Sequence, residues 1–120
     1  MGVTKTPEML RAAKDFAALQ LSQRSRSDRL LVARFASNGL DRTRFGISTG
    51  RRVGGAVVRN RIRRRIREGL RALAPRITPG WDVLVVVRPA GAMASQAELA
   101  ATIERLLRKG GALQEEGTPR

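Results

Sequence analysis

Arginines are the residues of this chain whose number and spacing indicate a chemical function. Six arginines fall within residues 59–67, and the segment from Arg59 to Arg71 holds seven arginines against one acid, Glu68. A guanidinium presents a planar fork of donors that matches phosphate oxygens, so a row of arginines on a rigid element can bind a polyanion. Surface helices usually pair opposite charges three or four residues apart, and this segment offers only Glu68 for such pairs. The pattern therefore favours polyanion binding over a merely solvated surface.

An apolar stripe runs through the same segment and predicts that it is a helix. The stripe consists of Val58, Ile62, Ile66, Leu70 and Leu73, spaced three or four residues apart. At about 100° per residue, these side chains share one face of a helix. The opposite face would carry Asn60, Arg64, Arg67 and Arg71, and the flanks would carry Arg59, Arg61, Arg63 and Arg65. We expect the helix to follow a turn at Gly54-Gly55 and to end near Ala74, because Pro75 cannot continue it.

The overall composition supports a basic protein without an active site of its own. The 120 residues carry a formal net charge of +14, and twelve basic residues but only one acid lie from Arg42 to Arg76. The chain has no cysteine and no histidine, which removes thiolate metal sites and the commonest general base. The ten acids are scattered. A protein-only nuclease is therefore disfavoured, and we predict no catalytic residue, metal site or organic cofactor in the protein.

Length and hydropathy predict one cytoplasmic domain. No apolar run approaches the roughly 18 residues that span a bilayer, and the N-terminus lacks the apolar core of a signal peptide. A basic amphipathic helix could also lie on an anionic membrane, but the stripe lacks the aromatics that favour this. We expect a single domain over residues 1–110 and a flexible tail over residues 111–120.

The N-terminal third predicts a helix followed by a polar segment. The helix would run from Pro7 to Leu19 or Leu21, capped by Thr6, with Glu8 near the positive end of its dipole. Its interior-facing residues would be Leu10, Phe16 and Leu19. The polar residues 22–27 are either a solvated connector or a short edge strand that adds to the cationic surface.

The remaining elements are three strands and a last helix. Residues 30–36 and 42–49 alternate as strands do, and Asn38-Gly39 between them predicts an antiparallel hairpin. The run from Val83 to Val87 suits a central strand that is covered on both faces. A helix should start at Ser95, which forms a capping box with Glu98. The order is α-β-β-α-β-α, with a short extra strand before the hairpin if residues 22–27 pair.

Residues 44–68 resemble the protein subunit of bacterial ribonuclease P. The resemblance rests on a glycine-containing strand, a basic pair, an apolar turn into a helix, and a basic signature at the helix start. These features are Arg44-Phe45-Gly46-Ile47-Ser48, Arg51-Arg52, Val53 to Val58, Arg59-Asn60-Arg61, Arg63-Arg64 and Arg67-Glu68. A weaker similarity takes in nearly the whole chain except its tail.

The resemblance implies a function, a set of partners and a fold. In that family a large RNA cleaves the 5′ leader from precursor tRNA, using Mg²⁺ held mainly by the RNA, and the small basic protein assists. The implied partners are ribonuclease P RNA and precursor tRNA, with no obligate protein partner and no membrane. The implied fold is an α/β (α+β) two-layer sandwich with a small mixed sheet, which is shared with a domain of a small-subunit ribosomal protein. It contains an unusual left-handed β-α-β crossover.

The resemblance also implies two binding surfaces. The surface for the RNA subunit would comprise Arg51, Arg52, Arg59, Asn60, Arg61, Arg63, Arg64 and Arg67. The cleft for the precursor-tRNA leader, between the first helix and the sheet, would comprise Phe16, Arg11 and Arg34. Many family members carry a further aromatic one turn after Phe16, where this chain has Leu19 and Gln20. Phe16 itself could stack on a base or belong to the core.

One alternative explains the charge equally well. A small ribosomal protein or a general RNA-binding protein would be just as small and basic. It would not explain the ordered signature from Arg44 to Glu68.

Overall fold

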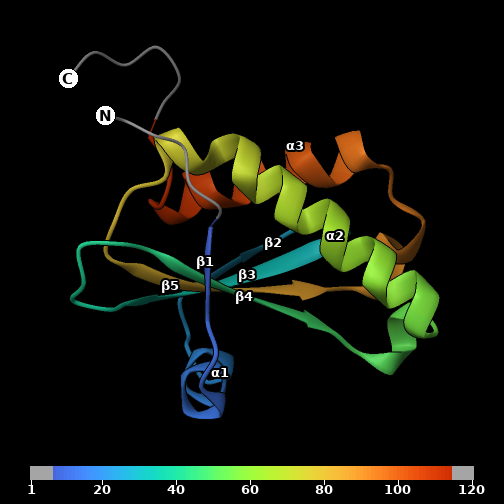
Figure 1. Cartoon of the computed structure of the whole chain (residues 1–120), viewed down its shortest axis with the longest axis horizontal. Helices are drawn as coiled ribbons and strands as arrows, with labels where there is room; N and C mark the ends of the chain where they lie inside the picture. Colours follow the sequence, from blue (N-terminus) through green and yellow to red (C-terminus); the bar gives the residue numbers. More distant parts are fainter. Residues whose placement is uncertain (1–6, 115–120) are drawn as a thin grey trace.

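The valine run lies in the middle of a five-stranded sheet in the computed structural model, which describes residues 7–114 (Figure 1). Strand β5 (Trp81–Val87) pairs in parallel with β4 (Arg44–Thr49) and antiparallel with β3 (Leu31–Ser37). The edges are the short strands β1 (Glu8–Met9) and β2 (Ser25–Ser27), and the order is β1-β4-β5-β3-β2. The predicted central strand is confirmed, and residues 22–27 do contain an edge strand.

The helices form a layer on each face of this sheet. Helices α2 (Ala56–Leu73) and α3 (Gln96–Gly110) cover one face, and the shorter α1 (Ala13–Gln20) lies on the other (Figure 1). Short 3₁₀ turns connect the elements: η1 (Arg51–Val53), η2 (Ala74–Arg76) and η3 (Pro89–Met93). The mixed sheet and its helices confirm the predicted α/β fold class. Its β4–α2–β5 unit joins two parallel neighbours, and the left-handed crossover of that unit stays a prediction.

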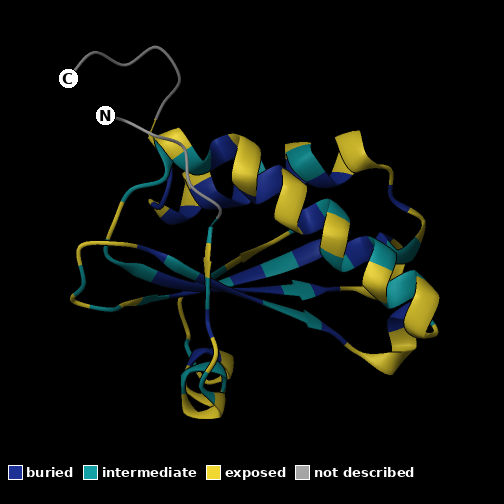
Figure 2. Cartoon of the chain, in the orientation of Figure 1, coloured by how far each residue is buried: buried dark blue, intermediate teal, exposed yellow. Residues whose placement is uncertain are grey.

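The main core lies between the sheet and the pair α2 and α3. On α2, Ile62, Ile66 and Leu70 have no exposed surface, whereas the opposite side of the helix is exposed along its length (Figure 2). A Cβ added at Gly69 would lie 3.1 Å from Ile103 Cδ1, so the two helices approach closely at this glycine. The predicted stripe, and the end of the helix before Pro75, are confirmed.

Helix α3 begins at the predicted capping box. The Ser95 side chain accepts a hydrogen bond from the Glu98 backbone N–H at 3.1 Å, and Glu98 accepts one from the Ser95 N–H at 2.9 Å. These two bonds satisfy backbone donors that the helix itself leaves unpaired.

The predicted first helix starts too early in the sequence. Glu8 and Met9 form a strand beside Arg44 and Phe45, and the Leu10 N–H extends the pairing to the Phe45 carbonyl at 2.7 Å. The helix begins only at Ala13, after an N-cap residue that makes no side-chain capping bond. Sheet pairing at the open edge of β4 thus overrides the helix-start signal at Pro7 and Glu8. The expected cap, Thr6, lies outside the described residues.

The predicted hairpin is also wrong, because β5 lies between the two strands that were expected to pair. The Asn38 side chain explains why the Asn-Gly turn does not close a hairpin. Its Nδ2 donates to the Trp81 carbonyl at 2.8 Å and to Asp82 Oδ1 at 2.9 Å, which ties the turn to β5. A strand that is apolar on both faces is most stable in the centre of the sheet, and this preference outweighs the local turn signal.

The domain continues beyond the predicted boundary at residue 110. Ala112 and Leu113 are buried, and the Thr78 N–H donates to the Ala112 carbonyl at 2.9 Å. A further bridge joins Ile77 to Leu113. Residues 111–113 therefore belong to the packed domain instead of a tail. The rest of the predicted tail, from residue 115, lies outside the described residues.

A partly buried ion pair holds the start of β4 to β5. Arg44 donates to Asp82 through Nε at 2.9 Å and through Nη2 at 2.7 Å. Burial alone would raise the pKa of Asp82, but the hydrogen bonds from Arg44 and Asn38 outweigh burial and lower it. The same carboxylate raises the pKa of Arg44.

We predict that Asp82→Asn lowers the free energy of unfolding at pH 7 by about 2 kcal/mol, because it removes a charge-assisted pair. The folded carboxyl has a lowered pKa, so its stabilisation is present above the unfolded pKa and is lost as pH falls through the folded pKa. The difference between variant and wild type should therefore shrink below about pH 4. Urea unfolding from pH 3 to pH 7 measures it. Asp41→Asn, at a carboxylate whose side chain is 95% exposed, is the control. A difference that stays constant over this range would contradict the prediction.

Candidate nucleic-acid interface

Eight residues of the predicted RNA-subunit surface lie on two consecutive elements, η1 and α2. Arg51 and Arg52 are exposed in η1, immediately before the turn at Gly54 and Gly55 that starts α2. On α2 the exposed members are Asn60, Arg64 and Arg67, while Arg59, Arg61 and Arg63 are half-buried along its flanks. This is the distribution that helical geometry predicts around the apolar stripe. We call these eight residues the arginine face.

Most arginines of this face lack a compensating partner. Within residues 7–114, six of them make no ion pair and no side-chain hydrogen bond: Arg51, Arg52, Arg59, Arg61, Arg64 and Arg67. The exception is Arg63, whose Nη1 donates to Asn60 Oδ1 at 3.1 Å. In Arg59 and Arg61 the Nε is buried without a partner among the described residues. The Nε atoms of Arg59 and Arg61 are thus enclosed by the protein, and no residue within 7–114 neutralises any of the six charges.

Two further arginines of α2 are already engaged. Arg65 Nη1 donates to the Ala94 carbonyl at 2.6 Å, which turns it toward the start of α3. Arg71 Nη2 lies 2.6 Å from Glu68 Oε1. Neither residue is in the predicted RNA-subunit surface, so the free charges and the predicted surface largely coincide.

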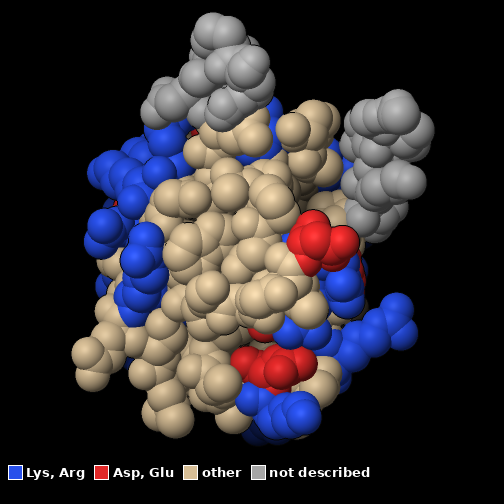
Figure 3. All heavy atoms as spheres, turned by 90° about the vertical axis from the view of Figure 1, so that its left-hand side faces the viewer, with Lys and Arg blue, Asp and Glu red and all other residues tan. Residues whose placement is uncertain are grey.

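Positive charge is not spread evenly over the rest of the molecule. The end of the molecule shown in Figure 3 has an uncharged centre, with Lys and Arg along its margins and Asp and Glu among them. Away from the arginine face, several carboxylates pair with nearby arginines, such as Glu104 with Arg76 and Arg108. The arginine face differs because its charges have no such partners within the described part of the chain.

Phe16 of the predicted leader cleft lies against the sheet. A Cβ added at Gly46 would lie 2.6 Å from Phe16 Cε1, so the absence of a side chain at Gly46 makes room for the ring. Phe16 packs beside the small core of Leu10, Leu19 and Leu84 and remains half-buried. Phe16 therefore contributes to the core while part of the residue stays exposed.

The other two predicted cleft residues lie at opposite ends of α1. Arg34 lies in β3, on the same sheet face as Gly46 but two strands away from it. Its Nη1 donates, at 3.2 Å, to the carbonyl of Ser22, which lies just after the end of α1. Arg11 is exposed just before the helix. The structure places Phe16 and Arg34 on the α1 side of the sheet and Arg11 just before α1, and it does not gather the three into one cluster.

Sequence reasoning missed one residue that positions this cleft. Arg44 holds Asp82 and also lies 3.9 Å from Asp15 of α1, so it links the first helix to the strand that carries Gly46. The alternation of Arg44, Gly46 and Ser48 along β4 was the available signal, since it puts a charge on the face that α1 covers.

Two features are absent from residues 7–114: a cluster of potential metal ligands and a helix able to span a membrane. No group of three or more acidic side chains converges there as it would around a metal ion. In the same range, none of the helices combines the length and the apolar character that a bilayer-spanning segment requires.

Comparison with known proteins assigns the chain to a family. The family model described as Ribonuclease P matches residues 4–111. The ribonuclease P protein component of Roseiflexus castenholzii is 40% identical over 106 residues, which cover 88% of this chain and 87% of the relative. That of Acidothermus cellulolyticus is 43% identical over 100 residues, covering 82% and 83%.

Solved structures agree with the sequence comparisons. The ribonuclease P protein of Thermotoga maritima superposes with a TM-score of 0.77 at 28% identity, covering 85% of this chain and 96% of that one. That of Staphylococcus aureus gives 0.80 at 25% identity, covering 88% and 97%. The chain belongs to the ribonuclease P protein family.

Proposed function

We propose that the arginine face binds the RNA subunit of ribonuclease P, and that the α1 side of the sheet binds the 5′ leader of precursor tRNA. As a member of its family, the chain is the protein component of the endoribonuclease that matures the 5′ end of tRNA. In this proposal the RNA subunit cleaves the bond, and the protein binds and orients RNA.

The observation that carries the proposal is a set of six guanidinium groups on η1 and α2 that have no ion-pair or hydrogen-bond partner within residues 7–114. Each can donate two parallel hydrogen bonds to phosphate oxygens, and fixed stems reduce the entropy lost on binding. Neutralising several phosphates releases counterions, so binding should weaken steeply as salt rises. Asn60 adds an amide whose Nδ2 makes no hydrogen bond to the described residues and can donate to RNA, since Arg63 uses only its Oδ1.

The proposal also divides the chemistry between the subunits. We expect Mg²⁺ to be held mainly by the RNA, where it would activate the attacking water and stabilise the leaving oxygen. The protein would contribute by lowering phosphate repulsion near the active centre and by holding the leader. A cytoplasmic location belongs to the same proposal, because precursor tRNA is made and processed there in bacteria.

The leader cleft is supported by the half-buried ring of Phe16 above the bare backbone of Gly46. A partly exposed aromatic side chain can stack on a base of any type. Arg11 and Arg34, at the two ends of α1, could contact phosphates on either side of that base. A ribosomal role remains the alternative with less support, since the family match accounts for both the charge and the ordered signature.

We predict that Arg64→Ala weakens binding to ribonuclease P RNA about tenfold, because it removes an exposed, unpaired contact to phosphate. The slope of log affinity against log salt should fall by about one. Filter binding over a range of salt concentrations measures both quantities. The matched control is Arg29→Ala, an exposed arginine on the turn between β2 and β3. Equal losses in the two variants would mean that charge acts without a defined docking surface.

We predict that Phe16→Leu leaves folding nearly intact but weakens binding of precursor tRNA to the holoenzyme about fivefold or more, because leucine fills the site yet cannot stack. Affinity for mature tRNA, which has no leader, should not change. Competition binding with both RNAs and urea unfolding of the variant provide the measurements. If precursor affinity is unchanged, Phe16 is a core residue only.

A further inference from the structure

The arginine-rich segment contains one acid that the proposed interface does not explain. Glu68 is the only carboxylate from Arg42 to Arg76, and it faces outward beside the free charge of Arg67. Its ion pair with Arg71 is exposed, with side-chain accessibilities of 51% and 54%. Exposed pairs of this kind stabilise little, so stability alone gives a weak reason for an acid that opposes polyanion binding.

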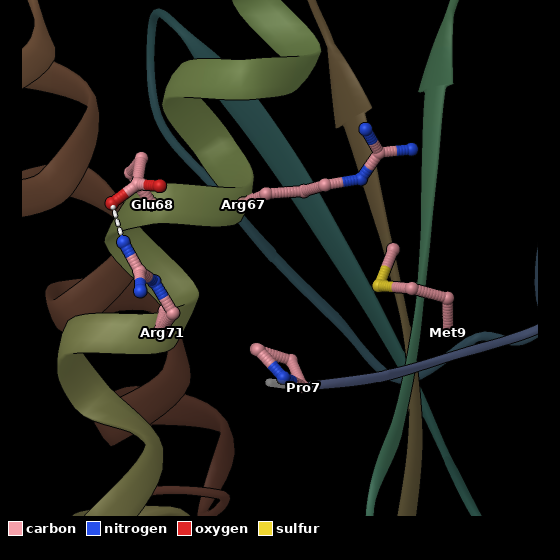
Figure 4. Close-up of a pocket in the computed structure, with 5 residues that line it drawn as sticks. All are labelled: Pro7, Met9, Arg67, Glu68 and Arg71. Atoms are coloured by element: carbon pink, nitrogen blue, oxygen red, sulfur yellow. Dashed lines mark hydrogen bonds and ion pairs between the residues drawn. The ribbon is translucent and has the colours of Figure 1, made fainter. Parts of the chain in front are cut away.

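Glu68 lines a pocket between α2 and the N-terminal segment. The pocket has a volume of about 490 Å³ and is lined by Pro7, Met9, Arg67, Glu68 and Arg71. Figure 4 shows Arg67 reaching from α2 across the opening toward the strands, with Met9 and Pro7 on the opposite side from the helix. Glu68 and Arg71 lie together on the helix side, joined by their ion pair.

This pocket combines features that suit a single nucleotide. Its volume falls within the range of small-ligand sites, and the proline ring and methionine thioether offer an apolar surface for a planar base. Arg67, which has no partner within residues 7–114, can donate to phosphate or to a base acceptor. Glu68 uses Oε1 for Arg71, while its Oε2 makes no hydrogen bond to the described residues. The pocket therefore offers both donors and a free acceptor.

We propose that this pocket binds one unpaired guanine nucleotide of the ribonuclease P RNA, with Glu68 accepting the guanine N1–H and N2–H; the proposal rests on the RNA interface proposed above. Guanine has two adjacent donors on its Watson–Crick edge, which match a carboxylate. Adenine and cytosine place a ring-nitrogen acceptor beside their amino group, and that nitrogen would repel the carboxylate. Uracil has no amino group. Arg67 then donates to the O6 atom or to the nucleotide's phosphate.

Charge alone predicts the opposite effect of removing Glu68. Neutralising an acid within a basic surface reduces repulsion from phosphates and should tighten RNA binding. In a guanine pocket, Glu68→Gln exchanges an acceptor oxygen for an amide that repels the guanine amino group. It should weaken binding to the RNA subunit about tenfold, as expected for a lost hydrogen bond to a charged group.

The test measures affinity for full-length ribonuclease P RNA at fixed salt for wild type, Glu68→Gln and the control Asp41→Asn. Asp41 is an exposed acid in the turn between β3 and β4, and its neutralisation should leave affinity unchanged or slightly higher. Circular dichroism and urea unfolding should show that both variants fold as the wild type does. Unchanged or tighter binding by Glu68→Gln would overturn the guanine pocket.

Chemical probing of the RNA tests the same pocket at the level of single bases. Kethoxal modifies the N1 and N2 atoms of unpaired guanines, so one guanine should be protected by wild type and become reactive with Glu68→Gln, while other protections persist. If wild type binds but no protected guanine depends on Glu68, the pocket proposal fails and the RNA interface stands. If wild type does not bind the RNA at all, the proposed function itself fails.

Discussion

Mutual repulsion among the arginines of α2 is the constraint that the rest of the structure must overcome. Six like-charged pairs lie three or four residues apart between Arg59 and Arg71, and at a few tenths of a kcal/mol each they disfavour the helix by about 1–3 kcal/mol. Burying Ile62, Ile66, Leu70 and Leu73 stabilises it by about 6–12 kcal/mol. Tertiary packing therefore outweighs the repulsion, and the folded helix presents the charges that we propose bind RNA.

Strand β4 connects this helix to the second proposed surface. Its residues alternate between the two faces of the sheet, so Phe45 packs in the core beneath α2 and α3 while Gly46 receives the ring of Phe16 from α1. Arg44 joins the same strand to Asp82 of β5 and approaches Asp15 of α1. Strand β4 thus helps to position α2, which carries most of the arginine face, and α1, which borders the proposed leader cleft.

The sequence predicted the elements whose periodicity is long or whose capping is complete. The stripe of α2, the capping box of Ser95 and the doubly covered β5 all have such signals, and each is confirmed. The errors arose where a local signal competed with distant pairing. Glu8 and Met9 join a sheet edge instead of the helix predicted to start at Pro7, and Asn38 binds β5 instead of closing a hairpin. Neither partner strand can be identified from the residues around the signal.

The same distinction between local and distant signals applies to the candidate site. Spacing along one helix was enough to assign the exposed and flanking arginines of α2, because those positions depend on helical geometry alone. The links of Arg44 to Asp82 and Asp15, and the pocket that joins Pro7 and Met9 to Glu68, depend on contacts between segments far apart in sequence. The measurement that tests the account most directly is cleavage of a precursor tRNA at low Mg²⁺, with ribonuclease P RNA alone, the protein alone and both together. We predict cleavage only with both, whereas cleavage by the protein alone, or no effect of the protein on its cognate RNA, would contradict the account.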